Sequence, residues 1–404
     1  MRISWFRPAP AHPAERLDDI PPLLAALGHT HDIDVVTEAD AHDFVWKQFR
    51  EPNDVCVYEV GNGQAHRFIW PYLFHYPGVL LLRQPHLHDS RAASLEQDEQ
   101  SADYAAEFLF NHGHPPRPVG RLLPRGGWPM LRAPLLASRL VVVDDVDLAH
   151  VLQEEHPDAR LRHVPLGVEA GPWWESGTWV GSGAVGGRPE PATGSGTDGH
   201  PGPAAVRFAV FGDGRRGVAE RALMRAAQAG ERVELVTNPS PAQALAQCDV
   251  VLALTWPAAG EPLTPALAGM AARKPVVTFE VEATAGWPAL DPQTWRPRGV
   301  DAPGAPIVAS IDPRDDEHSL MVAMRRLGSD AGLRASLADA GHAWWRAHGT
   351  LAHAVSAWLR VLDEARALPP PPHPSDWPPH LAADGTSRVR AILREMGTSV
   401  DFLP

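Results

Sequence analysis

The chain has 404 residues, of which 44% are hydrophobic and 21% are charged, and its formal net charge is −13. A chain of this length is longer than one hydrophobic core usually serves, so two domains are expected. The composition excludes a largely disordered chain. The acidic balance argues against general attraction to nucleic acid, so any phosphate site has to be a local group of arginines.

The cysteines and the length of the apolar runs indicate where in the cell the protein is expected. Cys56 and Cys248 lie in separate apolar stretches and are expected to be reduced core thiols. No apolar run is long enough to span a bilayer, and the N-terminus lacks a signal-peptide pattern. We therefore expect a cytoplasmic protein without a transmembrane segment.

Apolar strands alternate with helical segments through the first 170 residues. The expected strands are 2–6, 32–37, 54–60, 78–83 and 139–145, and the spacing at 17–27 predicts a helix despite two prolines. Such alternation is typical of a parallel sheet covered by helices, which binds ligands at the carboxyl ends of its strands. Residues 1–170 are predicted to form a Rossmann-like domain.

A Gly/Pro-rich stretch at 171–205 interrupts this pattern, and we interpret it as a linker or a disordered insertion. A second alternating unit follows at 206–368, and a Pro-rich tail with a short helix occupies 369–404. The expected strands of the second unit are 206–211, 232–237, 249–254 and 275–281. The predicted fold class is α/β, with two Rossmann-like domains facing a cleft.

A glycine-rich turn follows the first strand of the second unit, in the segment "FAVFGDGRRGVAE". Gly212, Gly214 and Gly217 fit the dinucleotide-binding pattern, but that pattern also needs an acid at the end of the next strand, and Glu234 is mid-strand. Arg215 and Arg216 suit an anion held by guanidinium groups as well as by backbone N–H groups. The turn is therefore predicted to hold a diphosphate.

A second anion site is expected in "TWPAAGEPLTPALAGMAARKPVV", residues 255–277. A helix is predicted to start near Thr264 as its N-cap, and the free N–H groups of such a helix end favour anions. The candidate binding residues here are Glu261, Pro262, Leu263 and Thr264, and the Glu261 carboxylate suits sugar hydroxyls. Both loops are expected at the same edge of one sheet.

Three segments together resemble the retaining GT-B glycosyltransferases of the "group 1" (family 4-like) type. Residues 56–92 have a glycine-asparagine turn, a strand and a histidine-rich loop. Residues 137–168 end on a P-x-G-V motif, and residues 249–277 have the donor-site strand, G-E loop and helix. The resemblance implies a GT-B fold with a nucleotide-sugar donor on the C-terminal domain, an unknown acceptor on the N-terminal domain and no obligatory metal or cofactor.

The resemblance also implies roles for particular residues. Arg215 or Arg216 would hold the donor diphosphate, Glu261 would contact the donor sugar, and His88, in the loop after the fourth strand, would lie near the reacting centre. Transfer would proceed with retention at the sugar carbon, the departing diphosphate being stabilised electrostatically. The family's second glutamate would fall eight residues after Glu261, where this chain has Gly269.

Two alternative functions remain at this point. Gly269 and a glycine-free loop after the first strand favour a binding or regulatory protein that has kept the fold and lost turnover. The glycine pattern alone favours an NAD(P)-dependent oxidoreductase, which would need Glu234 or a neighbour to reach a ribose. The His-x-His pairs lack the cysteine or carboxylate spacing that would complete a zinc site, so we predict no metal. The Asp-Val-Asp segment at 145–147 follows a strand and precedes a helix, so Asp144 or Asp145 is instead expected to be an N-cap.

Overall fold

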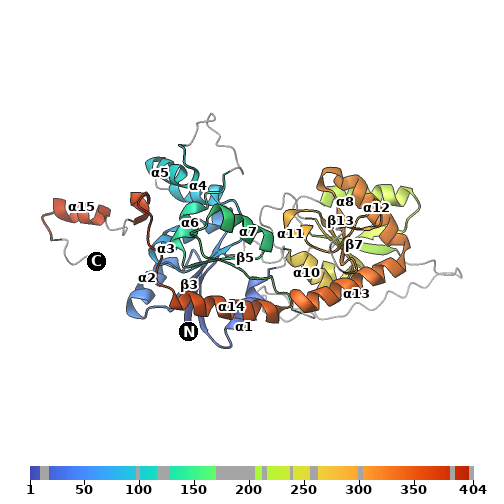
Figure 1. Cartoon of the computed structure of the whole chain (residues 1–404), viewed down its shortest axis with the longest axis horizontal. Helices are drawn as coiled ribbons and strands as arrows, with labels where there is room; N and C mark the ends of the chain where they lie inside the picture. The colour runs from blue at the N-terminus through green and yellow to red at the C-terminus, as the bar shows by residue number, and fades with distance from the viewer. Residues whose placement is uncertain are drawn as a thin grey trace.

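A computed structural model of the chain describes residues 1–9, 18–96, 101–115, 128–169, 205–211, 216–236, 240–254, 263–298, 304–382 and 387–399. Within these residues the chain forms two α/β units, each built on one sheet (Figure 1). The predicted fold class, α/β with two Rossmann-like units, is thereby confirmed.

The N-terminal unit has a six-stranded parallel sheet in the order β2-β1-β3-β4-β5-β6. Its strands are β1 (Arg2–Phe6), β2 (Asp32–Val36), β3 (Val55–Val60), β4 (Val79–Leu82), β5 (Leu140–Val143) and β6 (Leu161–His163). Its helices are α1 (Ile20–Leu27), α2 (Ala41–Arg50), α3 (Ile69–His75), α4 (His88–Glu96), α5 (Ser101–His112), α6 (Arg132–Ala137) and α7 (Val146–Glu155). The strand order reverses at β1, so the topological switch point lies between β1 and β3.

The C-terminal unit has a seven-stranded sheet in the order β12-β11-β13-β10-β9-β7-β8, in which only the β11–β12 pair is antiparallel. Its strands are β7 (Val206–Phe211), β8 (Val233–Leu235), β9 (Val250–Ala253), β10 (Val276–Phe279), β11 (Ala289–Leu290), β12 (Pro297–Arg298) and β13 (Val308–Ile311). Its helices are α8 (Arg216–Gln228), α9 (Pro241–Gln247), α10 (Thr264–Ala271), α11 (Glu282–Ala285), α12 (Asp316–Ser329) and α13 (Ala331–His348). Its switch point lies between β7 and β9.

Both sheets are covered on both faces, which is why their strands are continuous apolar runs. In the C-terminal unit, α8 and α12 pack on one face and α9, α10 and α13 pack on the other. In the N-terminal unit, α2, α3, α6 and α7 pack on one face. The opposite face is covered by α1 together with a helix from far along the chain, α14 (Leu351–Ala367).

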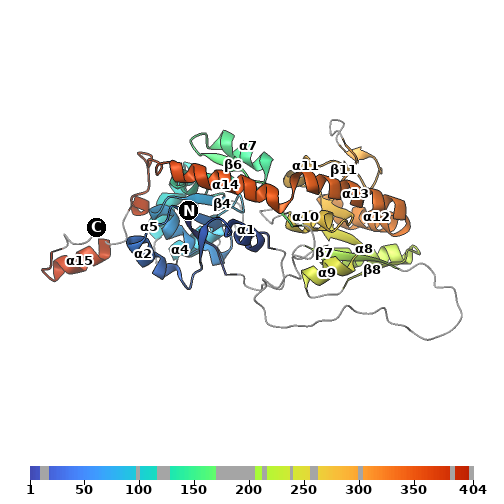
Figure 2. The same ribbon diagram turned by 90° about the horizontal axis from the view of Figure 1, so that it is seen from below.

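The packing of α14 differs from the predicted domain boundary at residue 368. The helix itself was expected at 352–367, but its apolar face contacts the N-terminal sheet, where Trp358 packs on Trp5 with ring centroids 4.9 Å apart. Figures 1 and 2 show α13 continuing into α14 along one side of both units. Helical periodicity shows which face of a helix is buried but not which sheet receives it.

The predicted tail also contributes to the N-terminal unit. Trp377 and Leu381 join its core, and Trp377 packs edge-on against Phe110, with ring centroids 5.3 Å apart. Arg132 pairs with Asp376 at 3.0 Å. A short helix, α15 (Ser387–Glu395), follows as predicted.

The chain crosses between the units twice, and the two crossings lie side by side. Val168 forms a bridge with Thr350, its N–H donates to the Gly349 carbonyl at 2.9 Å, and its own carbonyl accepts from Leu351 at 3.2 Å. Gly167 makes this approach possible, because a Cβ there would lie 2.5 Å from the Ala354 Cβ and 2.9 Å from the Leu351 Cα.

We predict that Gly167→Ala lowers the free energy of unfolding by about 1–3 kcal/mol, since the added methyl group meets backbone that has no room to move. Urea denaturation measures this change. The matched control is Gly286→Ala, where nothing lies within 4 Å of the added Cβ, and a change of less than about 0.5 kcal/mol is expected. Equal effects of the two substitutions would contradict the account of the crossing.

Candidate functional site

The carboxyl edges of the two sheets meet each other. Thr264, at the start of α10, donates its hydroxyl to Asp19 Oδ1 at 3.4 Å, and Asp19 follows β1 on the N-terminal unit. A second contact joins α7, which follows β5, to α11, which follows β10. Ligands of such sheets bind outside the carboxyl ends of the strands, so the functional site is expected where these two edges come together.

On the C-terminal unit, the two predicted phosphate loops follow neighbouring parallel strands. β7 pairs with β9 in parallel, so the residues after Phe211 and after Leu254 start from the same edge, at the switch point. Gly212, Gly214, Arg215, Glu261 and Pro262 lie outside the described residues. Their roles stay predictions.

Three of the predicted binding residues are described. Arg216 is the first residue of α8 and donates to Glu220 Oε1 at 3.0 Å from a half-exposed side chain. Leu263 takes the N-cap position of α10, so the prediction that Thr264 is the N-cap is wrong. The reason is that the Thr264 side chain is fully buried and its hydroxyl bonds to the other unit instead of to its own helix.

A group of charged side chains occupies the carboxyl edge of the N-terminal sheet. We call it the edge cluster, and it consists of Arg7, Asp18, Asp19, Glu59, Arg83 and Asp144. Arg83 lies at its centre, 2.8 Å from an oxygen of Asp19, 3.7 Å from Asp144 and 3.9 Å from Glu59. Arg7 pairs with Asp18 at 2.6 Å and with Glu59 at 3.4 Å.

Two guanidinium groups face four carboxylates in the edge cluster, so it carries an excess of two negative charges when all are ionised. Burial raises the pKa of Glu59, and the neighbouring Arg7 and Arg83 only partly oppose the rise. Burial likewise raises the pKa of Asp144 to about 6, against the attraction of Arg83. Burial alone would lower the pKa of Arg83, but Asp19, Asp144 and Glu59 outweigh it and raise that pKa, so the arginine stays charged.

His88 is the first residue of α4, not part of a loop, and both of its ring nitrogens are engaged. Nε2 lies 2.8 Å from the Tyr104 hydroxyl and Nδ1 lies 3.2 Å from Asp89 Oδ1, and the side chain is buried. Asp89, by contrast, leaves 40% of its side chain exposed. The group that this edge presents to a ligand is therefore the Asp89 carboxylate, with His88 behind it.

Asn62 holds the same carboxylate from the neighbouring strand. Its amide Nδ2 donates to Asp89 Oδ2 at 3.0 Å, and its Oδ1 accepts from the Asp89 backbone N–H at 2.7 Å. Gln84 in turn accepts a hydrogen bond from the Asn62 backbone. Asn62 was recognised from the sequence only as part of a glycine-asparagine turn, and nothing singled out Asp89, because Asn62, which holds it, is 27 residues away along the chain.

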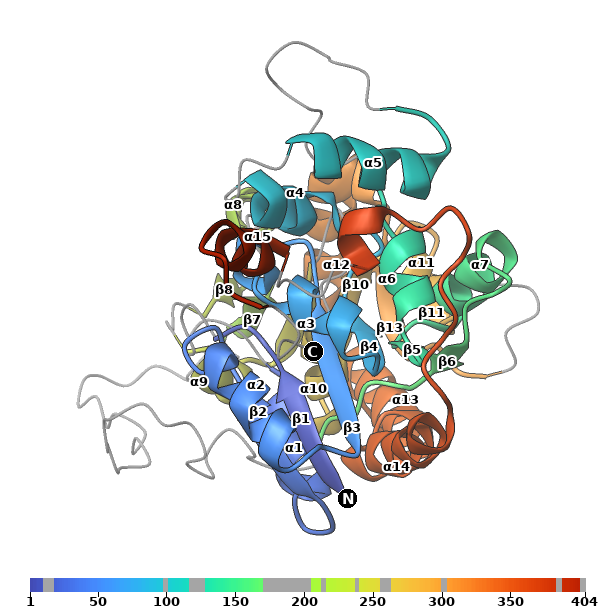
Figure 3. The same ribbon diagram turned by 90° about the vertical axis from the view of Figure 1, so that its left-hand side faces the viewer.

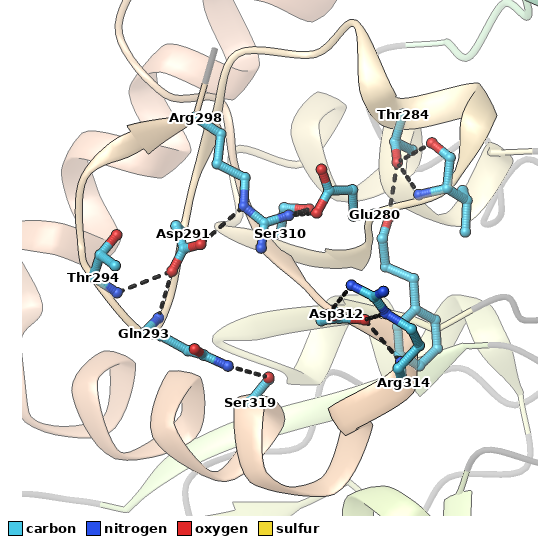
Figure 4. Close-up of polar contacts among 12 residues, drawn as sticks. Glu280, Thr284, Asp291, Gln293, Thr294, Arg298, Ser310, Asp312, Arg314 and Ser319 are labelled. Atoms are coloured by element: carbon cyan, nitrogen blue, oxygen red, sulfur yellow. Dashed lines mark hydrogen bonds and ion pairs between the residues drawn. The ribbon is translucent and has the colours of Figure 1, made fainter. Parts of the chain in front are cut away.

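A second polar group lies along the C-terminal sheet, at the carboxyl ends of β10 and β13 and on β12 (Figure 4). Arg298 contacts Glu280, donates to Asp291 Oδ2 at 3.0 Å and to Ser310 Oγ at 3.4 Å. Beside it, Arg314 donates to Asp312 at 2.8 Å, and this hydrogen bond lowers the pKa of Asp312 to about 2. Arg298 fastens the antiparallel strand β12 to the sheet, so these contacts have a structural role.

A small pocket adjoins the edge cluster at the crossings. Asp19, Arg83 and Asp144 form its polar end, Leu23, Val142 and Trp358 belong to its apolar wall, and Pro165–Gly167 of the first crossing closes one side. The pocket therefore touches both the charged edge of the sheet and the first crossing between the units.

Gly269 faces the sheet, not the site. A Cβ at this position would lie 2.8 Å from Val276 Cγ2 and 3.1 Å from Val251 Cγ2, inside the layer between α10 and strands β9 and β10. A glutamate would not fit there. The chain therefore has no room at position 269 for the carboxylate that the resemblance would place there.

No protein-family model matches this sequence, and no curated protein matches it. Solved structures do match over most of the chain. They include the glycotransferase of kitacinnamycin, at 15% identity over 89% of this chain and 99% of that chain, with a TM-score of 0.43. HepE of Anabaena, solved in complex with UDP-glucose, matches at 10% identity over 91% of this chain and 100% of that chain, with a TM-score of 0.46.

A putative UDP-N-acetylglucosamine 2-epimerase from Listeria monocytogenes also matches, at 11% identity over 92% of this chain and 98% of that chain, with a TM-score of 0.48. All three TM-scores are below 0.5, and transferases and an epimerase appear side by side. These likenesses carry no argument about activity, which has to rest on the residues of this chain.

Within the described ranges, no three or more His, Cys, Asp or Glu side chains come together as a metal site. The described helices also include none with the length and apolar character needed to cross a membrane. Of the two predicted caps, Asp144 and Asp145, it is Asp145 that caps α7, its carboxylate accepting from the backbone N–H groups of Asp147 and Leu148 at 2.8 and 3.2 Å.

The raised pKa of Asp144 gives a pH-dependent stability. Its pKa of about 6 in the folded chain exceeds the value of about 3.9 in an unfolded one, so the folded state holds this proton more tightly and stability is lost as the pH rises between these values. We predict that the free energy of unfolding of Asp144→Asn, relative to that of the wild type, rises by about 1–3 kcal/mol as the pH increases from about 4 to about 7.

Urea denaturation over that pH range measures the difference between the variant and the wild type. Val146→Ala serves as the control, because this exposed apolar residue lies in the same turn and carries no charge. It should follow the wild type at every pH. A pH-independent difference for Asp144→Asn would show that burial does not hold the proton on this carboxyl.

Proposed function

We propose that the chain is a glycosyltransferase that moves a hexose from a nucleotide-sugar donor to a hydroxyl group of an acceptor. One observation carries the proposal: two doubly wound sheets bring their carboxyl edges together at the Thr264–Asp19 contact. Such an arrangement lets one sheet hold a nucleotide and the other hold a second substrate, with the reacting atoms between them. The acceptor remains of unspecified class, whether glycan, lipid or small molecule.

The donor would bind at the switch point of the C-terminal sheet. Arg215 and Arg216, with the backbone of Gly212 and Gly214, would hold the diphosphate after β7. The loop after β9 would complete the site, with Glu261 on the sugar and Pro262, Leu263 and Thr264 bringing the N-terminus of α10 close. The proximity of β7 and β9 in the sheet supports this assignment.

The acceptor would bind against the N-terminal edge. Asp89 is an exposed carboxylate fixed from two sides by Asn62 and His88, so it suits a hydrogen bond to an acceptor hydroxyl. His88 is then a positioning residue, because its own nitrogens are engaged with Asp89 and Tyr104.

The transfer breaks the bond between the sugar anomeric carbon and the diphosphate oxygen and forms a bond to the acceptor oxygen. The acceptor proton ends on the released nucleoside diphosphate, and the transfer retains the anomeric configuration when both events occur on the same face. This course needs no side-chain base, which agrees with the engagement of both His88 nitrogens. Positive guanidinium and helix N–H groups would stabilise the departing charge.

A binding protein without turnover stays the first alternative, favoured by Gly269 and by the glycine-free loop after the first strand. The second alternative has less support. The oxidoreductase needs an acid at the end of β8, whereas Glu234 lies in the middle of that strand and pairs in register with Arg207. Glycosyl transfer therefore remains the function that the geometry supports best.

The first test changes Arg215 and Arg216 together to alanine. Each charge-assisted contact to phosphate contributes about 1.5–3 kcal/mol, so nucleoside diphosphate binding should weaken at least about tenfold. Isothermal titration measures the affinity, and the melting temperature should stay nearly unchanged. Arg225→Ala is the matched control, since Arg225 lies further along α8 and pairs with Glu317 at 2.9 Å. Unaltered affinity of the double variant would remove both arginines from the site.

The second test separates the sugar from the nucleotide. Glu261→Ala should weaken binding of the nucleotide sugar by about tenfold, because a carboxylate hydrogen bond to sugar hydroxyls is lost, while the affinity for the bare nucleoside diphosphate stays the same. Parallel titrations of the two ligands measure this ratio. Equal losses for both ligands would move Glu261 to a structural role.

A further inference from the structure

The carboxyl edge of the N-terminal sheet carries more acids than the edge cluster alone. Figure 3 looks onto this unit, in which β1, β3, β4 and β5 are neighbouring strands. Arg67 at this edge is already paired with Glu38 at 3.1 Å, and burial lowers the pKa of His66 to about 4, so neither adds an unpaired positive charge. The described residues at or just after the carboxyl ends of β1 to β5 hold eight carboxylates, Asp18, Asp19, Glu38, Asp40, Glu59, Asp89, Asp144 and Asp145, against Arg7, Arg67 and Arg83, a formal charge of −5.

The acids of this edge reach solvent, whereas the arginines of the edge cluster are covered. Arg7 and Arg83 leave only 12% and 11% of their side chains exposed. Asp18 and Asp144 leave 31% and 21% exposed, in addition to the exposed carboxylate of Asp89. A ligand that approaches the edge therefore meets carboxylate oxygens before it meets a guanidinium group.

The two arginines do not satisfy all of the carboxylates around them. Glu59 leaves only 9% of its side chain exposed, and its Oε2 finds no hydrogen-bond partner among the described residues. Arg7 Nε lies 3.4 Å from this oxygen, and Arg83 Nε lies 3.9 Å from Glu59 Oε1. A buried polar atom without a hydrogen bond indicates a missing partner. The missing partner is a donor, because an ionised carboxylate only accepts hydrogen bonds.

The small pocket beside the edge cluster offers room for a cationic donor. Asp19 and Asp144 form its polar end together with Arg83, and the Trp358 ring belongs to its apolar wall. Arg83 Nη1 lies 3.7 Å from Asp144 Oδ2, which is longer than a hydrogen bond, so this carboxylate can accept one from a ligand. An ammonium group donates three hydrogen bonds and is attracted both to carboxylates and to an aromatic face.

The charge of this edge argues against other classes of ligand. A phosphate or carboxylate group would be repelled by the exposed Asp18, Asp89 and Asp144. Within the described residues the acids do not gather into a metal site. The other unit is expected to take the opposite charge, since Arg215 and Arg216 are predicted to hold a diphosphate. An acidic edge opposite them keeps that diphosphate from binding on the wrong unit.

We propose that the acceptor is a small hydroxyl compound that carries a protonated amine, as an amino sugar does. Its ammonium group lies in the pocket against Asp19 and Asp144, and its reacting hydroxyl binds Asp89. The two seats follow neighbouring strands, β5 and β4. The inference rests on the proposed function in naming this ligand the acceptor, whereas the preference of the edge for a cation depends only on its charge.

Titrations of the full chain with three sugar probes test the preference for a cation. Glucosamine carries an ammonium group where glucose carries a hydroxyl, and glucuronate carries a carboxylate. Ligand-observed NMR at pH 7 should give glucosamine a dissociation constant at least about fivefold below that of glucose, because a charge-assisted hydrogen bond is added to the same ring contacts. Glucuronate should bind more weakly than glucose, and added salt should reduce the preference for glucosamine.

Three variants locate the preference on the edge. Asp144→Asn should bring the two dissociation constants close together, whereas Asp89→Asn should weaken both sugars and leave their ratio unchanged. Asp158→Asn is the matched control, since Asp158 is an exposed acid between α7 and β6, at the opposite edge of the same sheet, and it should keep the wild-type ratio.

Equal binding of glucosamine and glucose would overturn the proposal, and so would a ratio that Asp144→Asn leaves unchanged. A ratio that falls equally in Asp158→Asn would also overturn it, because the amine would then respond to the acidic chain as a whole. The titrations contain no nucleotide, so their outcome is independent of glycosyl transfer. Failure of the proposed function appears separately, as the absence of nucleoside diphosphate release from nucleotide sugars.

Discussion

Arg83 makes it possible to bury the carboxyl edge of the N-terminal sheet. Three carboxylates surround its guanidinium. Without this cation none of them could be buried in the charged form, because an unpaired buried charge costs several kcal/mol. One of the three, Asp19, also accepts the Thr264 hydroxyl from the other unit. The same cation therefore stabilises the edge where an acceptor would bind and fixes the residue through which the two units touch.

Connectivity adds a second constraint. The two crossings run side by side at Val168 and Thr350, and α14 then covers the sheet with which the chain began. Gly167 is needed because the second crossing leaves no space for a side chain. The units are thus tied together at one side, next to the pocket and the edge cluster, while the predicted donor loops follow strands β7 and β9.

Much of the fold could be predicted from sequence because buried parallel strands are continuous apolar runs, and every strand named from the sequence is present. The short strands β11 and β12 were missed because two residues carry no periodicity, and β13, the four residues Val308–Ile311, was also missed. The site was predicted less well. Arg83 gave no signal of its own, since its partners are 64 and 24 residues away along the chain, at Asp19 and Glu59. The sequence analysis singled out His88, but its neighbour Asp89 is the exposed group. The burial of His88 depends on contact with Tyr104 of α5, which the local sequence does not reveal.

The central claim is that the two facing edges transfer a sugar from a nucleotide. The most direct measurement incubates the chain with the common UDP, GDP, ADP and TDP sugars and follows release of the nucleoside diphosphate, with melting temperatures recorded in NAD and NADP alongside. The account predicts release from the sugars of one base, and stabilisation by that nucleoside diphosphate of about 2.7 kcal/mol at a hundred times its dissociation constant. Stabilisation by NAD or NADP alone, with no nucleotide sugar consumed, would contradict it.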